Sequence, residues 1–186
     1  MTCIVGIEHD EKVWIGGDSA GSDGMSLTIR ADEKVWADKG FVFGFTGSFR
    51  MGQLLRYKLV LALERHEVPA DDAAAEIKYM STAFIDSVRT VLKEGGYAKV
   101  ENGNESGGVF LVGWRGKLYQ VHSDFQVGRA AQGFGAIGSG GSWATGVLYA
   151  LRDSKDTPES KILAALDAAK ELTPYVRGPF KVVADV

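Results

Sequence analysis

Thr2 stands directly behind the first methionine, at the head of the apolar stretch CIVGI. If Met1 is removed, which the small threonine side chain permits, Thr2 carries both a hydroxyl and a free α-amine. The pKa of a free α-amine is about 7.7–8.0, so much of it is neutral near physiological pH and can accept a proton. A threonine hydroxyl activated by its own amine is a recognised pair of nucleophile and base that needs no histidine. The start of the chain therefore predicts nucleophilic chemistry at Thr2.

Three further polar residues are candidates to complete such a site. Asp18 follows two glycines at the end of an apolar run, Lys34 lies in the stretch ADEKVW, and Ser139 lies among glycines. Taken singly, such residues are more often a solvated carboxylate, a surface lysine and a helix cap. Taken with Thr2, the ammonium group of Lys34 would favour the neutral amine and assist loss of the hydroxyl proton. Asp18 could hold that ammonium group charged and in place.

The composition narrows the class of protein. The chain has 186 residues, 45% hydrophobic and 24% charged, with a formal net charge of -3. These values predict one globular domain over residues 1–186, with no general attraction to nucleic acid or anionic membranes. The single cysteine, Cys3, excludes an internal disulfide, and the widely spaced His9, His66 and His122 do not suggest a metal centre. We find no signal peptide and no membrane-spanning stretch, so we expect a cytoplasmic protein.

A glycine-rich stretch, GFGAIGSGG, raises the question of a dinucleotide site. It places Gly133, Gly135 and Gly138 at the spacing G-x-G-x-x-G. Such a site needs a strand, these glycines, a helix and then a parallel strand. Here the helix expected after the glycines leads into another helix. We therefore expect no nicotinamide or flavin cofactor.

The spacing of apolar residues predicts blocks of strands separated by pairs of helices. Short apolar runs predict strands at 2–8, 12–17, 33–37, 41–46, 108–114, 118–122 and 135–139, and a last strand within 180–186. Helical spacing predicts helices at 48–65, 71–93, 142–153 and 158–172, with buried stripes that include Leu59 in the first, Ile77, Met80, Phe84, Val88 and Val91 in the second, and Trp143, Val147 and Leu151 in the third. The polar stretches 17–24 and 97–108 are expected to be loops. This order favours an α+β fold of two antiparallel sheets packed face to face, with a helix pair outside each.

Five stretches, in order along the chain, resemble the proteasome β-type subunits and HslV-like peptidases, which are N-terminal nucleophile (Ntn) hydrolases. They are TCIVGI at the start, GGDS with Asp18, EKV with Lys34, GFTGS with Gly47, and AIGSGGSWATGVLYAL with Ser139. No single stretch is specific, but their intervals also agree with the family over almost the whole chain. The resemblance implies a four-layer αββα sandwich of two antiparallel sheets, the Ntn hydrolase fold.

The same resemblance implies a role for each candidate residue. Thr2 is the nucleophile and its amine the general base, and Asp18, Lys34 and Ser139 form the supporting network. The backbone N–H of Gly47 faces the developing oxyanion. Substrate binding is implied for Ser22 and Gly47, which pair with extended peptide, and for Gly21, Trp36, Phe45 and Phe49, which border the first specificity pocket.

The implied function is that of a threonine-type endopeptidase assembled in stacked homo-oligomeric rings. Its substrates would be peptides or unfolded proteins, and its partner an ATPase that unfolds them. One departure concerns the stretch ELTPYVRG, because proteasome subunits carry an Asp and a Ser there and this chain has Thr173 and Val176. Two alternatives stay open: a catalytically silent ring or scaffold subunit, and an Ntn amidohydrolase that acts on small amides. The presence of the whole candidate network argues against the silent subunit.

Overall fold

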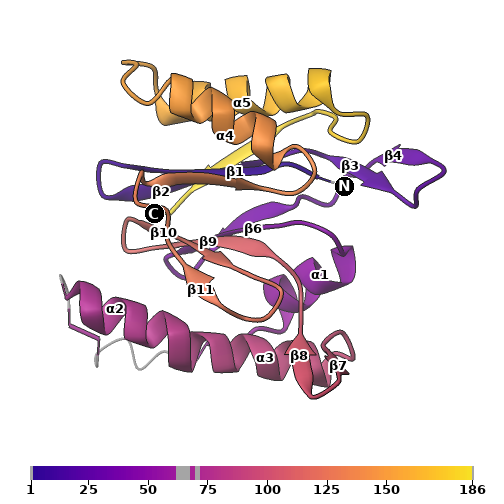
Figure 1. The fold of residues 1–186 in the computed structure, drawn as a ribbon, viewed down its shortest axis with the longest axis vertical. Coiled ribbons are helices and arrows are strands. Elements are labelled where there is room, and N and C mark those ends of the chain that lie inside the picture. Colours follow the sequence, from indigo (N-terminus) through magenta and orange to yellow (C-terminus); the bar gives the residue numbers. More distant parts are fainter. Residues whose placement is uncertain (1, 62–67, 70–71, 186) are drawn as a thin grey trace.

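Two antiparallel sheets form the centre of the computed structural model, which describes residues 2–61, 68–69 and 72–185 (Figure 1). The first sheet has the order β12-β1-β2-β13, with β1 at Ile4–His9, β2 at Lys12–Gly17, β12 at Phe134–Ile137 and β13 at Lys181–Ala184. The second has the order β11-β10-β9-β6-β5, with β5 at Val35–Asp38, β6 at Phe41–Phe45, β9 at Phe110–Trp114, β10 at Lys117–Val121 and β11 at Val127–Gly128. The antiparallel pairing that the order of elements predicts is confirmed.

The outer faces of the two sheets are covered by different helices (Figure 1). Above the first sheet lie α4 at Gly141–Ala150 and α5 at Pro158–Leu172. Below the second lie α1 at Phe49–Tyr57, α2 at Ala73–Tyr79, the π-helical turn η1 at Met80–Phe84 and α3 at Ile85–Glu94. The start of α5 agrees with the prediction, since Pro158 is its first residue and the Thr157 side chain caps the Ser160 N–H.

Alternating side chains of β1 explain why this strand is apolar at nearly every position. Val5 and Ile7 belong to a buried cluster with α4 and α5, whereas Ile4 belongs to the cluster between the two sheets. Successive side chains of a strand point to opposite faces, so a strand covered on both sides needs apolar residues throughout. The third cluster lies between the second sheet and the lower helices, where Phe41 stacks on Trp114 with ring centroids 5.5 Å apart.

The strand registers bring several chain segments to one end of the sheets. Ile4 pairs with Gly17 on one side and with Ile137 on the other. The residues before Ile4 therefore lie beside those after Gly17 and after Ile137. At the same end the Phe45 N–H donates to the Lys34 carbonyl at 3.1 Å.

The first predicted helix is shorter than expected. α1 ends at Tyr57, and beyond it Leu59 and Leu61 are partly buried while Val60 is 83% exposed. Exposure that alternates in this way is typical of extended backbone, so the prediction that Leu59 is helical is wrong. The remainder of that prediction, residues 62–65, lies outside the described residues.

The second predicted helix is interrupted by η1. Met80, Phe84, Val88 and Val91 are buried as predicted, but Ile77 is 37% exposed, and Glu76 and Tyr79 are buried in its place. A π-helical turn has i→i+5 hydrogen bonds and so shifts the helical phase by about one residue. The apolar stripe therefore changes face before Met80. Residue 71 of this prediction lies outside the described residues.

The buried face of α4 also differs from the prediction. Trp143 is 50% exposed, and Ala144 and Leu148 face the core instead. The helix approaches the sheet through small residues, since a Cβ on Gly140 would lie 2.9 Å from the Cβ of Cys3. The prediction is therefore wrong for Trp143, whereas Val147 is partly buried against the cluster that contains Ala144 and Leu148, and Leu151 is also partly buried.

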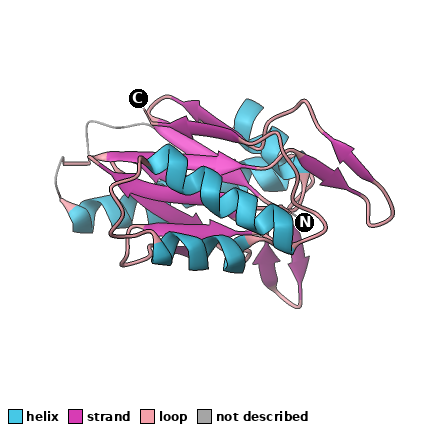
Figure 2. Ribbon diagram, turned by 90° about the horizontal axis from the view of Figure 1, so that it is seen from above, coloured by secondary structure: helices cyan, strands magenta, loops and turns pink. Residues whose placement is uncertain are grey.

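Two stretches predicted as loops contain strands of small hairpins. One pairs β3 at Ala20–Ser22 with β4 at Leu27–Ile29, and the other pairs β7 at Lys99–Glu101 with β8 at Asn104–Ser106. The second turns at Asn102 and Gly103, both with positive φ, which is the turn that an Asn-Gly pair favours. Figure 2 shows the β3–β4 hairpin extending beyond the sheets and helices. Within the described residues no helix is long and apolar enough to cross a membrane.

Candidate active site

Thr2, Asp18 and Lys34 meet at the sheet end described above, and each is only 2% exposed. Lys34 Nζ donates to Thr2 Oγ1 at 3.0 Å and to Asp18 Oδ1 at 2.8 Å. The three residues come from three strand ends: the start of β1, the end of β2 and the start of β5. A lysine side chain buried in this way is uncommon unless its charge is paired, and here the Asp18 carboxylate pairs it.

Backbone amides fix the orientation of the Asp18 carboxylate. The Cys3 N–H donates to Oδ1 at 3.1 Å, and the Ala20 N–H donates to Oδ2 at 3.0 Å. The Asp18 N–H in turn donates to the Cys3 carbonyl at 3.3 Å. Because every contact comes from a rigid part of the main chain, Lys34 Nζ is held in one direction, toward Thr2.

The segment Gly138–Gly140 contacts Thr2 from the other side. The Thr2 N–H donates to Ser139 Oγ at 3.2 Å, and the Gly140 N–H donates to the Thr2 carbonyl at 3.2 Å. Gly138 has φ +94°, and a Cβ placed on it would lie 2.2 Å from the Thr2 carbonyl oxygen. Only glycine fits there, both for its backbone angle and for its space.

Burial and charge tune the ionisable groups of this cluster. Removal from water lowers the pKa of Lys34 from its ordinary value, and the Asp18 carboxylate partly opposes that shift. Burial, with a smaller contribution from the Asp18 charge, raises the pKa of Cys3 to about 12. The Cys3 thiol therefore stays protonated near neutral pH, and Thr2 carries the hydroxyl that faces the lysine.

The predicted substrate-binding residues come from the turn after β6, from β3 and from β6. Gly47 follows β6 with φ +86° and open space where a Cβ would be. Gly21 lies on β3, where a Cβ would be 3.4 Å from the Phe49 ring, and Ser22 Oγ accepts the Gly24 N–H at 3.1 Å. Phe45 is only 3% exposed.

A hollow beside the cluster is walled by Trp36, Phe45 and Phe49. Its other lining residues come from the segment before β5 and from α1, namely Asp32, Glu33, Gly52, Gln53, Arg56 and Tyr57. The Phe49 ring lies at the boundary with the cluster, because Lys34 Nζ is 5.7 Å from its centroid and the Arg30 guanidinium is 4.2 Å from it. The aromatic residues predicted to border a specificity pocket thus line a hollow together.

Sequence reasoning missed two residues that bear on the site. Gly138 belongs to the glycine-rich spacing and to the stretch AIGSGG, and its place beside Ser139 is a signal that the chain turns tightly there. Arg177 follows Val176 in the stretch singled out as a departure, and its guanidinium nitrogen Nη1 lies within hydrogen-bonding distance of three backbone carbonyls. Nothing in the sequence indicates those contacts.

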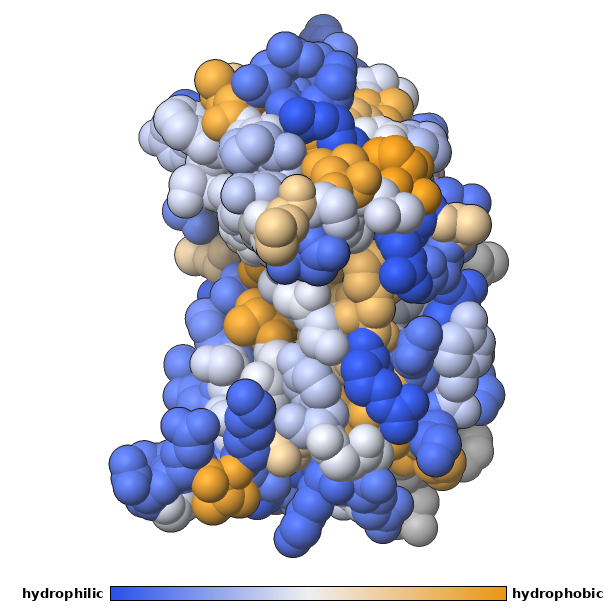
Figure 3. All heavy atoms as spheres, turned by 90° about the vertical axis from the view of Figure 1, so that its right-hand side faces the viewer, coloured by the Kyte–Doolittle hydropathy of each residue, from blue (hydrophilic) through white to orange (hydrophobic). Residues whose placement is uncertain are grey.

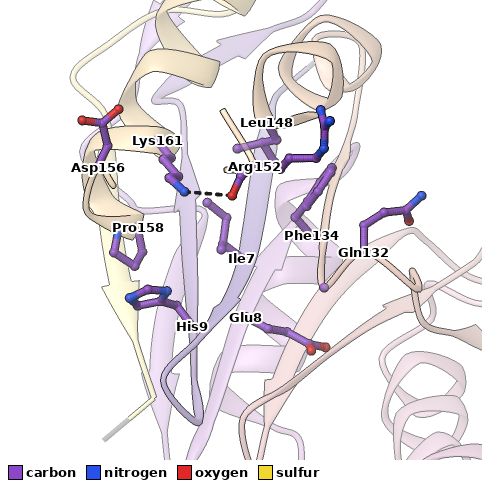
Figure 4. A pocket seen from close by; sticks show the side chains of 11 residues that line it. Ile7, Glu8, His9, Gln132, Phe134, Leu148, Arg152, Asp156, Pro158 and Lys161 are labelled. Carbon is purple, nitrogen blue, oxygen red and sulfur yellow. Dashed lines mark hydrogen bonds between the residues drawn. The ribbon is translucent and has the colours of Figure 1, made fainter. Parts of the chain in front are cut away.

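Two further surface features are not part of the cluster of Thr2, Asp18 and Lys34. Met25, Leu27 and Ile29 are exposed on the β3–β4 hairpin, which extends toward the side shown in Figure 3, where apolar patches interrupt polar surface. A second hollow lies at the opposite end of β1, where His9, Leu148 and Lys161 are among its lining residues (Figure 4). Lys161 Nζ there donates to the Arg152 carbonyl at 3.4 Å. Among the residues that the structure describes, no three His, Cys, Asp or Glu side chains gather as a metal site would need.

Comparison with protein-family models and with curated proteins gives no match. Solved structures do match. The chain is similar to BPH of Thiobacillus denitrificans in complex with epoxomicin, with 20% identity and a TM-score of 0.77 over 98% of this chain and 97% of that chain. It is similar to eukaryotic HslV from Trypanosoma brucei, with 19% identity and a TM-score of 0.69 over 98% of each chain. It is also similar to Anbu, an ancestral beta-subunit, from Yersinia bercovieri, with 15% identity and a TM-score of 0.64 over 99% of this chain and 81% of that chain.

These likenesses define the class of fold: the chain has the proteasome β/HslV-like fold of the Ntn hydrolases. The resemblance indicated by the five sequence stretches is thereby confirmed at the level of fold. Among the proteins with this fold, those that the chain resembles include BPH, HslV and Anbu.

Proposed function

We propose that this protein is a threonine-type endopeptidase in which removal of Met1 makes Thr2 the N-terminal nucleophile. The observation that carries the proposal is the contact between Lys34 Nζ and Thr2 Oγ1, at 3.0 Å, with Asp18 holding the same ammonium group at 2.8 Å. We further assign the arrangement of helices and sheets to the four-layer αββα sandwich of the Ntn hydrolases. The likeness to HslV, at 19% identity, supports the fold on which the proposal rests.

In the proposed reaction the Thr2 amine takes the proton of its own hydroxyl, and Oγ1 attacks the carbonyl carbon of the substrate. The Lys34 ammonium group stabilises the negative charge that develops on Oγ1 and keeps the nearby amine neutral. Ser139 Oγ, which lies 3.2 Å from the Thr2 nitrogen, orients the amine. The Gly47 N–H is assigned to the oxyanion, where one donor typically lowers the barrier by about 2.7–4 kcal/mol.

The second half of the reaction returns the enzyme to its starting state. The protonated amine gives its proton to the leaving nitrogen as the C–N bond breaks, which leaves an ester between Thr2 Oγ1 and the acyl part of the substrate. Water then attacks the ester carbonyl, the amine takes a proton from that water, and Oγ1 leaves with a proton. Apart from the substrate and one water molecule, the bonds made and broken in these steps involve no group beyond the Thr2 hydroxyl and amine.

We propose that the substrate is an extended peptide that pairs with Ser22 and Gly47, and that Gly21 borders the pocket for its first side chain. This side chain would point toward the hollow walled by Phe45 and Phe49. Active sites of this kind would act on peptides or unfolded proteins in the cytoplasm, inside a homo-oligomeric assembly of stacked rings fed by an ATPase unfoldase. The likeness to Anbu, described as a beta-subunit, supports the assembly, and light scattering of the purified protein tests it.

Two measurements test the catalytic assignment. Intact-mass spectrometry is expected to show loss of Met1, because a Thr2 nitrogen acylated by methionine cannot act as a base. Turnover of a fluorogenic peptide is expected to be lost in Thr2→Ala and partly kept in Thr2→Ser, which preserves a hydroxyl beside the amine. Equal rates for wild type and Thr2→Ala would remove the nucleophile assignment.

The same measurements separate the alternatives. A silent scaffold subunit predicts an intact Met1 and no turnover, together with a ring in light scattering. A small-amide amidohydrolase predicts loss of Met1, a monomer or small oligomer, and cleavage of small amides in preference to peptides. The contact between Lys34 and Thr2 favours either enzyme over the scaffold, since a scaffold gains nothing from a buried charge beside a hydroxyl.

A further inference from the structure

Arg177 lies in the loop between α5 and β13 and holds three backbone carbonyls with one nitrogen. Its Nη1 lies 3.4 Å from the Lys170 carbonyl, 3.1 Å from that of Thr173 and 2.6 Å from that of Val176. Nη1 has only two hydrogens, so one N–H is shared between two acceptors. The carbonyls of a helix C-terminus have no partner within the helix and favour a cation there. The guanidinium group therefore supplies the end of α5 with both hydrogen bonds and charge.

The main chain of Arg177 connects this helix end to the candidate active site. The Ser19 N–H donates to the Arg177 carbonyl at 2.9 Å, and Ser19 Oγ donates to the Pro179 carbonyl at 2.5 Å. Ser19 lies between Asp18, which holds Lys34, and Ala20, whose N–H donates to Asp18 Oδ2. The loop that Arg177 closes is thus bonded to the residue next to the Asp18 carboxylate.

Packing gives a second connection. Val176, next to Arg177, is fully buried and belongs to the same apolar cluster as Cys3. Cys3 follows Thr2, and its N–H donates to Asp18 Oδ1 at 3.1 Å. A shift of the loop after α5 would therefore reach the site along two routes, through Ser19 and through Val176.

We propose that Arg177 is a positioning residue, whose guanidinium group acts as a built-in cation that fixes the loop after α5 and thereby holds Asp18 in place for Lys34. This inference rests on the proposed peptidase for its catalytic consequence, but its structural part stands apart from activity. Arg177 lies in the stretch ELTPYVRG, where Thr173 and Val176 stand at the positions that the family resemblance gives to an Asp and a Ser. In this chain the two contribute backbone carbonyls, and Arg177 brings the charge.

The test compares Arg177→Ala with Arg152→Ala, a matched control. The Arg152 guanidinium also donates to a carbonyl near a helix end, that of Tyr149 at 2.8 Å, and its other contacts are with the Tyr149 ring and the Asp153 carboxylate, which lie at the end of α4 and just after it. The first readout is the rate at which a thiol reagent labels Cys3 in the folded protein, without denaturant. Cys3 is the only cysteine in the chain. Burial protects this thiol and raises its pKa to about 12, so a loosened site exposes it and increases its reactive thiolate form. We expect labelling of Arg177→Ala to be faster by about tenfold or more, and that of Arg152→Ala to be unchanged.

The second readout is peptide turnover normalised to the folded fraction measured by circular dichroism. We expect kcat of Arg177→Ala to fall about tenfold to 100-fold with little change in KM, because a small misplacement of catalytic groups has an effect of that size. Guanidinium at about 10 mM, far below denaturing concentrations, is expected to restore part of kcat and slow the labelling, since a hollow lined by Thr173 and Pro174 lies at that point. Arg177→Lys, which keeps the charge, should be intermediate.

The outcomes separate this inference from the proposed function. Wild-type labelling and wild-type kcat in Arg177→Ala would overturn the positioning role and leave the peptidase intact. If the wild-type protein shows no peptide turnover, but Cys3 is labelled faster in Arg177→Ala than in wild type, the positioning role is supported and the peptidase is contradicted. If Arg177→Ala does not fold, Arg177→Gln decides, because it keeps most of the aliphatic stem but is uncharged and too short to reach the three carbonyls. Faster labelling of that variant supports the role of the guanidinium group, and wild-type labelling contradicts it.

Discussion

Lys34 Nζ lies 3.0 Å from Thr2 Oγ1, although 32 positions separate the two residues in the chain. The contact forms where the start of β1, in the first sheet, meets the start of β5, in the second. The packing of the two sheets against each other therefore creates the site, and the cluster of Ile4, Val35 and Ile137 between them is what holds it.

Replacing Lys34 with alanine is expected to abolish peptide turnover and leave the oligomer assembled. The change leaves the Asp18 carboxylate buried without its cation, which typically costs about 3–5 kcal/mol in free energy of unfolding. Fluorogenic turnover, light scattering and urea unfolding measure the three effects. Lys170→Ala is the control, since its pairs with Asp167 and Glu171 are at the surface and such pairs contribute at most about 1 kcal/mol. Wild-type turnover in Lys34→Ala would contradict the proposed network.

Gly138→Ala is expected to lower kcat about tenfold or more, because its Cβ would collide with the Thr2 carbonyl oxygen. Gly24→Ala provides a matched control, since Gly24 has φ +95°, close to the +94° of Gly138, but has nothing within 4 Å of its Cβ position. Both variants carry the backbone strain of about 1–3 kcal/mol. Only the first disturbs Thr2, so equal activities would show that the contact with Thr2 has no catalytic consequence.

The pH dependence of kcat/KM is expected to be bell-shaped. Activity rises with pH as the Thr2 amine loses its proton, and the nearby positive charge of Lys34 moves this limb below the ordinary range of about 7.7–8.0. Activity falls again as Lys34 loses its proton. Burial lowers the pKa of Lys34, so the alkaline limb should lie below the ordinary value of 10.5. An alkaline limb at or above that value, in protein that circular dichroism shows to be folded, would contradict this assignment.

Phe49→Ala is expected to change cleavage specificity. The Phe49 ring lies between Lys34 and the hollow walled by Trp36 and Phe45, so it limits the space beside the nucleophile. Wild-type enzyme should prefer small side chains at the residue whose carbonyl is attacked, and the variant should accept large apolar ones. The ratio of turnover between peptides with alanine and peptides with leucine at that position measures this preference. Phe49→Leu, which keeps most of the volume, is the control and should retain the wild-type preference.

Part of the fold could be read from local patterns. The hairpin of β1 and β2, the strands β5, β6, β9 and β10, and the helix α5 follow from apolar spacing and turn residues, because those signals lie within a few positions of one another. The predictions that were wrong involve distant partners. Trp143 is exposed because α4 packs through Gly140 and Ala144, and Ile77 is exposed because a π-helical turn changes the phase before Met80.

For the candidate site, the sequence by itself determined the kinds of group available: a hydroxyl that can share a residue with an amine, a lysine, an aspartate and a serine among glycines. Only the tertiary structure decided that these groups lie within 2.8–3.2 Å of their neighbours, with Thr2, Asp18 and Lys34 buried and Ser139 at the surface beside them. It also decided the fit of Gly138 against Thr2 and the bonds of Arg177 to three carbonyls. The physical reason is that strand register and sheet packing bring distant backbone segments together, and no local pattern along the chain encodes the distance between them.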